Sequence, residues 1–236
     1  MESPSGRRPG FILYLISDRK LAAAHGGLIP VCEAVLRAAA DGGRAGEIAI
    51  QLREKDLPAR ELYELAIGLR KLTRRWRAAL LINDRVDVAI AADADGVHLP
   101  ARSFPVEDAR KLVGPSRLIG VSTHSDGEVR AAAERGADFA VHGPVFPPLS
   151  KGGYAPPQGI AALYAACRAA ARMPVYALGG ITTERVGELF GGAGAASGGA
   201  RPAGVAAIGA VFGAEEPPRA AGAILDVIAR RLSANP

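Results

Sequence analysis

Short apolar runs alternate with longer amphipathic segments along almost the whole chain. The runs resemble strands buried on both faces, and they lie at residues 11–16, 47–52, 78–82, 96–99, 118–121, 139–141, 175–178 and 205–208. Between them, apolar residues recur three or four positions apart, as on one face of a helix. These helical segments lie around residues 28–36, 62–69, 86–90, 106–112, 128–135, 160–171, 183–190 and 219–232.

Strict alternation of strand and helix predicts a parallel sheet. Eight such units in about 220 residues favour a closed (β/α)8 TIM barrel, an α/β fold. A doubly wound open sheet is the alternative, but no G-x-G-x-x-G follows the first strand. We expect one barrel domain over residues 10–236, preceded by a disordered tail at residues 1–9.

The overall composition is that of a folded globular domain. Hydrophobic residues make up 49% of the 236 residues, and the net charge is only +5, which excludes a disordered chain. No run of about 18 apolar residues suggests a membrane span. Cys32 and Cys167 form no framework, so we expect buried free thiols and a cytoplasmic protein.

The densest group of basic residues is best interpreted as a solvated helix face. A nucleic-acid patch is the alternative, but basic residues elsewhere are dispersed and aromatic residues make up only 5% of the chain. We therefore expect no nucleic-acid partner. The group consists of Arg70, Lys71, Arg74, Arg75 and Arg77.

The second strand ends in residues that suit an anion. In a barrel, functional side chains gather at the C-terminal ends of the strands. Alternation places Gln51, Arg53 and Lys55 on the side facing the barrel mouth. An Arg and a Lys that converge there favour a phosphate or pyrophosphate. The alternative is a surface ladder of salt bridges with Glu54 and Asp56.

Polar residues also follow the third and fifth strands. Asp84 comes directly after Asn83; it is either a helix N-cap or a Mg²⁺ ligand beside a pyrophosphate. Ser122 and Thr123 can donate hydrogen bonds, and His124 can move a proton near neutral pH. A purely structural role is the alternative for His124.

The last three strands are followed by glycine-rich segments. A Gly/Pro-rich loop after the sixth strand, at residues 143–153, contains Lys151 and has the length of a lid. Gly179 and Gly180 follow the seventh strand, and Gly209 follows the eighth, in the pattern of a phosphate-binding cup. Gly/Ala-rich residues 191–199 are interpreted as a flexible insertion.

Six short motifs occur in the order of one known family. Together they resemble thiamine-phosphate synthase and its relative, the thiazole tautomerase, over residues 11–232. The resemblance implies a TIM barrel that joins a hydroxymethylpyrimidine pyrophosphate to a thiazole phosphate, with Mg²⁺, and releases pyrophosphate. The motifs lie at residues 51–55, 81–87, 94–99, 120–124, 143–146 and 179–182.

The resemblance also implies a role for individual residues. Those expected to hold the pyrimidine substrate are Gln51, Arg53, Lys55 and Asn83. Asp84 would bind Mg²⁺, while Ser122 and Lys151 would contact the pyrophosphate. Those expected to border the thiazole phosphate are Ser150, Gly180, Ile208 and Gly209. The residues expected to carry the catalysis are Lys151, Arg53 and Ser122, together with His124, whose acid–base role belongs to the tautomerase.

The sequence departs from the synthase pattern at three places. Ser103 stands where the synthase usually has a second Mg²⁺-binding Asp, Pro148-Leu149-Ser150 replaces Thr-x-Thr, and Gly209 replaces a Ser. The segment around Ser103 is more similar to the tautomerase, which needs no Mg²⁺ and uses a His matching His124.

The synthase remains the favoured function, because the tautomerase has no use for the whole pyrophosphate-binding set. The alternatives are the tautomerase and a non-catalytic regulator that binds thiazole phosphate. The expected partners are small phosphorylated substrates, and a homo-oligomer is compatible with the sequence.

Overall fold

The computed structural model describes residues 9–147, 156–191 and 200–233. Two predicted site residues, Ser150 and Lys151, therefore lie outside the described residues. The same holds for residues 1–8 of the predicted tail and residues 192–199 of the predicted insertion.

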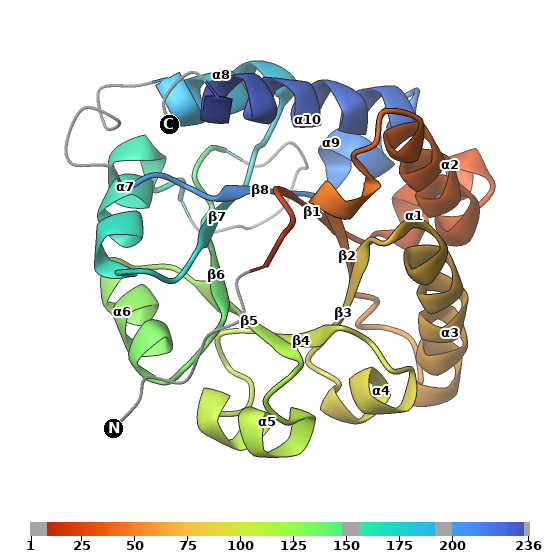
Figure 1. Ribbon diagram of the computed structural model, residues 1–236, viewed down its shortest axis with the longest axis horizontal. Helices are drawn as coiled ribbons and strands as arrows, with labels where there is room; N and C mark the ends of the chain where they lie inside the picture. The colour runs from red at the N-terminus through yellow and green to blue at the C-terminus, as the bar shows by residue number, and fades with distance from the viewer. Residues whose placement is uncertain (1–8, 148–155, 192–199, 234–236) are drawn as a thin grey trace.

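Eight parallel strands close into a barrel in chain order, as the sequence predicts (Figure 1). Each strand pairs with the next one, and β1 also pairs with β8. The strands are β1 Leu13–Ile16, β2 Ile48–Leu52, β3 Ala79–Asn83, β4 Gly96–Leu99, β5 Leu118–Thr123, β6 Phe139–His142, β7 Val175–Leu178 and β8 Gly204–Ala207. Several predicted boundaries differ by one or two residues; β8, for example, ends before Ile208, which instead precedes a short helix.

Helices surround the barrel on its outer side (Figure 1). The longer ones match the predicted segments: α2 Leu28–Asp41, α3 Ala59–Trp76, α4 Val86–Ala91, α5 Val106–Val113, α6 Asp126–Glu134, α7 Gly159–Ala169, α8 Thr183–Gly191 and α10 Pro217–Ser233. Short ones were not predicted: α1 Arg19–Ala22, η1 Ala23–His25, η2 Ala45–Glu47 and α9 Gly209–Phe212. Such elements are only one turn long, so no hydrophobic period reveals them.

The strands bury different residues on their two faces. Outward-facing Val, Ile, Leu and Ala pack against the helices in the larger core cluster. Inside the barrel, an aromatic group fills the end at which the strands begin: Phe11, Tyr14, Phe139 and Tyr176. The ring of Phe139 meets Tyr14 and Tyr176 edge-on, with centroids 5.5 Å apart in both pairs. The N-terminal end of the barrel is therefore solid core, and polar groups line its C-terminal end.

The basic face of α3 is largely neutralised by acidic neighbours. Arg70 pairs with Asp95 at 2.7 Å, and Arg74 pairs with Asp93. Arg75 lies 3.5 Å from Glu33. These ion pairs agree with the interpretation of a solvated helix face.

The remaining global predictions concern the cysteines and membrane spans. Cys32 and Cys167 are buried free thiols, as predicted, and burial raises the pKa of each to about 12, so both are inert. Over the described ranges, no single helix is long and apolar enough to cross a membrane. The helical segments Arg19–His25 and Leu28–Asp41 are long and apolar enough only when they are taken together, and a bend of 75° separates them.

Candidate active site

Polar side chains line the interior of the barrel at the C-terminal ends of β2 to β5. Ala49, Leu81 and Leu118 belong to the interior cluster. Because side chains alternate along a strand, Gln51, Asn83 and Ser122 share their side of the sheet. Gln51 and Asn83 are buried, and Ser122 is half-buried. The alternation expected from the sequence therefore brings side chains from three strands into one mouth.

The carboxamide of Gln51 lacks a protein partner. The residue is only 1% exposed, yet neither Oε1 nor Nε2 forms a hydrogen bond within the described part of the chain. A buried amide without partners costs about 1–3 kcal/mol. Such a group is ready to accept from one ligand atom and to donate to another.

Arg53 and Lys55 do not form the ladder of salt bridges that was the alternative for this segment. Asp56 instead accepts three hydrogen bonds from the Arg19 guanidinium, at 3.0, 3.1 and 3.2 Å, and pairs with Lys20 at 3.0 Å. Neither Arg53 nor Lys55 has an ion pair among residues 9–147, 156–191 and 200–233. Within these ranges, no carboxylate competes with a ligand for either cation.

Ser17 anchors the backbone of this segment, a role that sequence reasoning missed. Its hydroxyl donates to Glu54 Oε1 at 2.6 Å and accepts from the Arg53 N–H at 2.8 Å. The Arg19 N–H also donates to Glu54 Oε1, at 3.1 Å. Glu54 is therefore bonded to Ser17, which follows β1, and to Arg19 in α1. The bond from the Arg53 N–H to Ser17 fixes the backbone where the chain leaves β2.

Asp84 is exposed and is not a helix cap. The N-cap of α4 is Arg85, and it makes no side-chain capping bond. Asp84 instead adopts a left-handed conformation with φ 64°, and its N–H donates to the His98 carbonyl at 2.8 Å. The Ser103 hydroxyl donates to Asp84 Oδ1. This backbone arrangement presents the Asp84 carboxylate beside the ends of β3 and β4.

The donor set around Asp84 fits Mg²⁺ only if a ligand completes it. No group of three or more His, Cys, Asp or Glu residues capable of holding a metal occurs in the described ranges. Mg²⁺ commonly takes one or two carboxylates and obtains its other ligands from phosphate oxygens and water. Asp84 supplies one such carboxylate, and Ser103 supplies a hydroxyl next to it.

A buried histidine links the aromatic core to the mouth. His98 is 2% exposed; its Nδ1 lies 3.3 Å from the Tyr14 hydroxyl, and its Nε2 lies 2.9 Å from Ser122 Oγ. Burial, aided by the Arg53 cation, lowers the pKa of His98 to about 3, so the imidazole is neutral at pH 7. The sequence places His98 in a family motif, but its type alone suggested no role.

His124 lies at the rim, where one ring nitrogen is held. Its Nδ1 is 2.7 Å from the Gly143 carbonyl, so Nδ1 carries the proton and Nε2 is the free nitrogen when the ring is neutral. Its backbone N–H donates to Glu128 Oε2 at 2.6 Å. Thr123, which we expected to be a donor at the mouth, is instead buried on the outer side and faces His142 Nδ1 at 3.4 Å.

The ends of β7 and β8 contribute backbone rather than side chains. Gly180 has φ 61°, and a Cβ there would lie 2.3 Å from the Pro147 carbonyl oxygen. Arg185 Nη1 donates to the Gly180 carbonyl at 2.6 Å, and its guanidinium stacks 5.1 Å above Phe146. Arg185 thereby connects the β7–α8 turn to the segment after β6.

The β8 end opens directly into a short helix. Ile208 is the N-cap of α9 and makes no side-chain capping bond, and Gly209 is the first helical residue. The N–H groups of this turn are therefore not covered by a capping side chain. Ile208 also packs against the interior cluster, so it borders the mouth.

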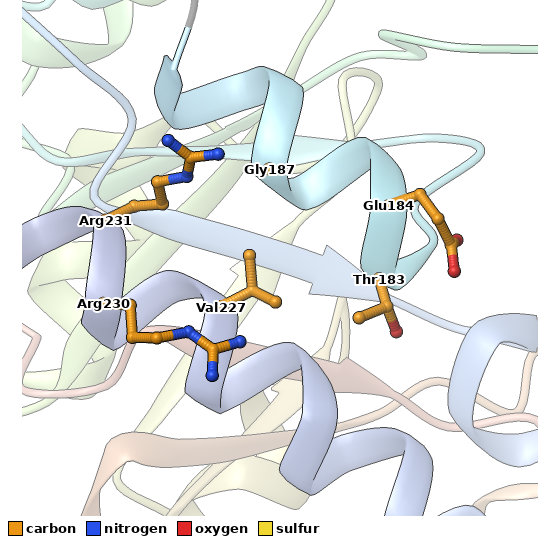
Figure 2. A pocket seen from close by; sticks show the side chains of 6 residues that line it. All are labelled: Thr183, Glu184, Gly187, Val227, Arg230 and Arg231. Carbon is orange, nitrogen blue, oxygen red and sulfur yellow. The ribbon is translucent and has the colours of Figure 1, made fainter.

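A hollow of about 550 Å³ lies away from the mouth, between α8 and α10, as Figure 2 shows. Arg230 and Arg231 project into it from α10, whereas the carboxylate of Glu184 points away from them. None of the strand-end residues lines this hollow.

Comparison with known proteins identifies the family of the chain. A sequence profile described as thiamine monophosphate synthase matches residues 13–211. The chain belongs to this family.

Similar sequences in the family match it over nearly their full length. A thiamine-phosphate synthase of Roseiflexus castenholzii is 41% identical, covering 97% of this chain and 91% of that protein. One of Moorella thermoacetica is 40% identical, covering 94% and 98%. Among solved structures, thiamine phosphate pyrophosphorylase from Pyrococcus furiosus has a TM-score of 0.78 at 34% identity, covering 95% of this chain and 98% of that one.

The structure places the predicted site residues of the described ranges in two groups around the mouth. Strands β2 to β5 bring the predicted side chains together: Gln51, Arg53, Asn83, Asp84 and Ser122. The ends of β7 and β8 contribute Gly180, Ile208 and Gly209 on the other side of the barrel. Lys55 is exposed at the edge of the first group.

Proposed function

We propose that this protein is a thiamine-phosphate synthase, which joins hydroxymethylpyrimidine pyrophosphate to thiazole phosphate. The observation that carries the proposal is the buried carboxamide of Gln51, which has no partner among the described residues, in a mouth where Arg53 and Lys55 likewise form no ion pair with them. An aminopyrimidine presents a ring nitrogen beside an amino group. Gln51 offers the matching donor and acceptor, so this ligand would satisfy both of its orphaned atoms.

The pyrophosphate would lie between β2 and β5. Arg53 supplies a cation that pairs with no carboxylate of the described ranges, and Ser122 supplies a hydroxyl near the end of β5. Lys151 is the third predicted contact; it remains a prediction from the sequence, because it lies outside the described residues. Such groups stabilise the negative charge that grows on a departing pyrophosphate.

Asp84 would hold Mg²⁺ together with the pyrophosphate oxygens. When bound, the metal ion supplies charge neutralisation to the leaving group. The Ser103 hydroxyl, which already donates to Asp84, keeps that carboxylate oriented. With a single carboxylate, we expect weak metal binding until the substrate arrives.

The thiazole phosphate would lie against the ends of β7 and β8. Gly180, Ile208 and Gly209 offer close backbone approach there, and helix N-termini favour phosphate. Ser150, the other predicted contact, lies outside the described ranges.

The reaction exchanges one bond for another. The C–O bond between the pyrimidine methylene and pyrophosphate breaks, and the electron pair leaves with pyrophosphate. The thiazole nitrogen then donates its lone pair to the methylene carbon, forming the C–N bond. No proton transfer is needed for this exchange, so positioning and charge stabilisation carry the catalysis.

The direct test is pyrophosphate release by the purified full chain. With both substrates and Mg²⁺, we expect turnover and a product with the mass of thiamine phosphate. Gln51→Leu should reduce kcat/KM for the pyrimidine substrate by about 10²-fold, because the amide partners are lost. Arg60→Leu is the control, because Arg60 is exposed on α3; this variant should leave turnover unchanged. Absence of turnover in the wild-type chain would refute the proposal.

A second function, thiazole tautomerase, is supported by the geometry of His124. With Nδ1 held by Gly143, its Nε2 is free to move a proton on a ligand at the rim. Two variants separate the functions. Asp84→Asn should abolish a Mg²⁺-dependent synthase but spare a tautomerase. His124→Gln should abolish a tautomerase assayed on a carboxythiazole phosphate but spare the synthase.

A further inference from the structure

Three buried groups form a chain of hydrogen bonds that ends at the mouth. The Tyr14 hydroxyl meets His98 Nδ1 at 3.3 Å, and His98 Nε2 meets Ser122 Oγ at 2.9 Å. Tyr14 is fully buried, His98 is 2% exposed, and only Ser122 reaches the open end. The contacts alone leave two proton arrangements, because a neutral imidazole carries its proton on either nitrogen.

The surroundings of Tyr14 select one arrangement. Its hydroxyl has no hydrogen-bond partner other than His98 in the described part of the chain. If His98 Nδ1 carried the proton, the Tyr14 hydrogen would be buried without an acceptor, at a cost of about 1–3 kcal/mol. Tyr14 therefore donates to Nδ1, and the single proton of the neutral ring is on Nε2.

The proton on Nε2 sets the direction of the last hydrogen bond. His98 Nε2–H donates to Ser122 Oγ, so the Ser122 hydroxyl hydrogen has no acceptor among the described residues. We infer that Tyr14 and His98 are positioning residues that turn the Ser122 hydroxyl into a hydrogen-bond donor toward an anionic, acceptor-only ligand in the mouth.

The direction matters because phosphate oxygens only accept hydrogen bonds from the protein. In the opposite arrangement Ser122 would donate to His98 and present only lone pairs to the anion, which is repulsive. The Arg53 cation acts on the same imidazole and disfavours its protonation, which preserves the neutral form that the chain requires. The inference uses the proposed function only for the nature of the ligand, a pyrophosphate.

The proton arrangement is tested without any substrate. Imidazole ¹⁵N chemical shifts distinguish protonated from unprotonated nitrogens, and His98→Gln assigns the His98 signals. In the wild-type protein at pH 7, we expect a neutral His98 with its proton on Nε2. A proton on Nδ1, or on both nitrogens, would overturn the inference. In Tyr14→Phe the constraint on Nδ1 is lost, so the Nδ1–H form should become populated.

The consequence for the ligand is tested with inorganic pyrophosphate and Mg²⁺ by calorimetry. Tyr14→Phe should raise the Kd about tenfold in the wild-type background and leave it unchanged in Ser122→Ala. Tyr176→Phe is the matched control: it removes another buried phenol of the same cluster, but one whose hydroxyl donates to the Phe11 carbonyl at 2.7 Å. We expect no change in Kd there.

The outcomes separate this inference from the proposed function. Equal losses of affinity in Tyr14→Phe and Tyr176→Phe, or a loss that persists in Ser122→Ala, would show that Tyr14 acts through packing and would overturn the inference. Failure of the wild-type chain to release pyrophosphate from the two substrates would refute the synthase, while the ¹⁵N result would still report the direction of the hydrogen-bond chain.

Discussion

The two sides of the barrel mouth differ in the groups that line them: side chains on one side and backbone on the other. From β2 to β5 the mouth is lined by side chains, among them the orphaned amide of Gln51 and the His98-oriented hydroxyl of Ser122. At β7 and β8 it is lined by backbone, with Gly180 in a conformation that leaves no space for a Cβ. Side chains discriminate between ligands by donor and acceptor pattern, whereas exposed backbone accommodates phosphate of any origin.

The difference suggests a division of labour within the proposed reaction. The side-chain half would select the pyrimidine and its leaving group, and the backbone half would hold the phosphate of the second substrate. Changes on the two halves should therefore have different signatures. Four sets of variants distinguish the two halves, in order from the largest expected effect to the smallest.

The largest effect is expected at the backbone half, in Gly180→Ala. The new Cβ would lie 2.3 Å from the Pro147 carbonyl in a left-handed conformation, so the turn must shift. We expect kcat/KM for thiazole phosphate to fall roughly 10²-fold, with unfolding free energy lower by about 3 kcal/mol. Gly136→Ala is the control, since φ is 84° but no atom lies within 4 Å. Equal effects at both glycines would attribute the loss to backbone strain alone.

A change of opposite sign is expected in the side-chain half. Gln51→Leu should lower turnover but raise the unfolding free energy of the ligand-free protein by about 1–3 kcal/mol, because two unpaired buried polar atoms disappear. Gln158→Leu is the contrast, since its Nε2 donates to the Gly143 carbonyl at 3.2 Å and the change should destabilise. Urea unfolding measures both. A destabilised Gln51→Leu protein would mean that the amide is satisfied in the free protein.

The buried imidazole of the side-chain half should make stability depend on pH. The pKa of His98 is about 3 in the folded protein against an ordinary value of 6.5. Between these values the unfolded chain binds a proton that the folded chain does not, so stability falls as pH decreases from 6.5 toward 3. The loss is about 2 kcal/mol at pH 5.

His98→Gln should reduce this pH slope, whereas His25→Gln, on η1 outside the barrel, should not. Tyr14, Ser122 and Arg53 face His98 and stay in place in both variants. His142, whose pKa burial also lowers, contributes in the same direction, so some slope should remain. An unchanged slope in His98→Gln would exclude His98 as its source.

The smallest effect is expected at the metal ligand. Ser103→Asp would add a second carboxylate beside Asp84 and remove the hydroxyl that donates to it. The Mg²⁺ concentration needed for half-maximal pyrophosphate release should fall about three- to tenfold, with the same product. Ser125→Asp, at the cap of α6, adds the same charge away from Asp84 and should leave the requirement unchanged. A higher Mg²⁺ requirement in Ser103→Asp would show that the two carboxylates repel more than they bind.

The sequence by itself determined the barrel and much of its mouth. Strand and helix periods are local properties, so all eight strands were predicted to within about two residues. The period of two placed Gln51 on the inner face. Asn83, Ser122 and Thr123 were predicted only from their position at strand ends, and that rule was wrong for Thr123, which follows Ser122 in β5 and therefore belongs to the outer face. One-turn elements such as α9 were missed because they carry no period.

Only the tertiary structure decided which polar groups meet. A ladder of salt bridges from Glu54 and Asp56 to Arg53 and Lys55, their neighbours in sequence, was the alternative to the predicted anion site. In the structure Glu54 instead accepts from Ser17 across the β1–β2 pair, and neither cation has an ion pair with another described residue. The hydrogen-bond chain from Tyr14 to Ser122 likewise joins β1, β4 and β5 through the barrel interior. Such contacts span 24 to 84 positions, and they depend on strand order, stagger and packing together, which no local pattern encodes.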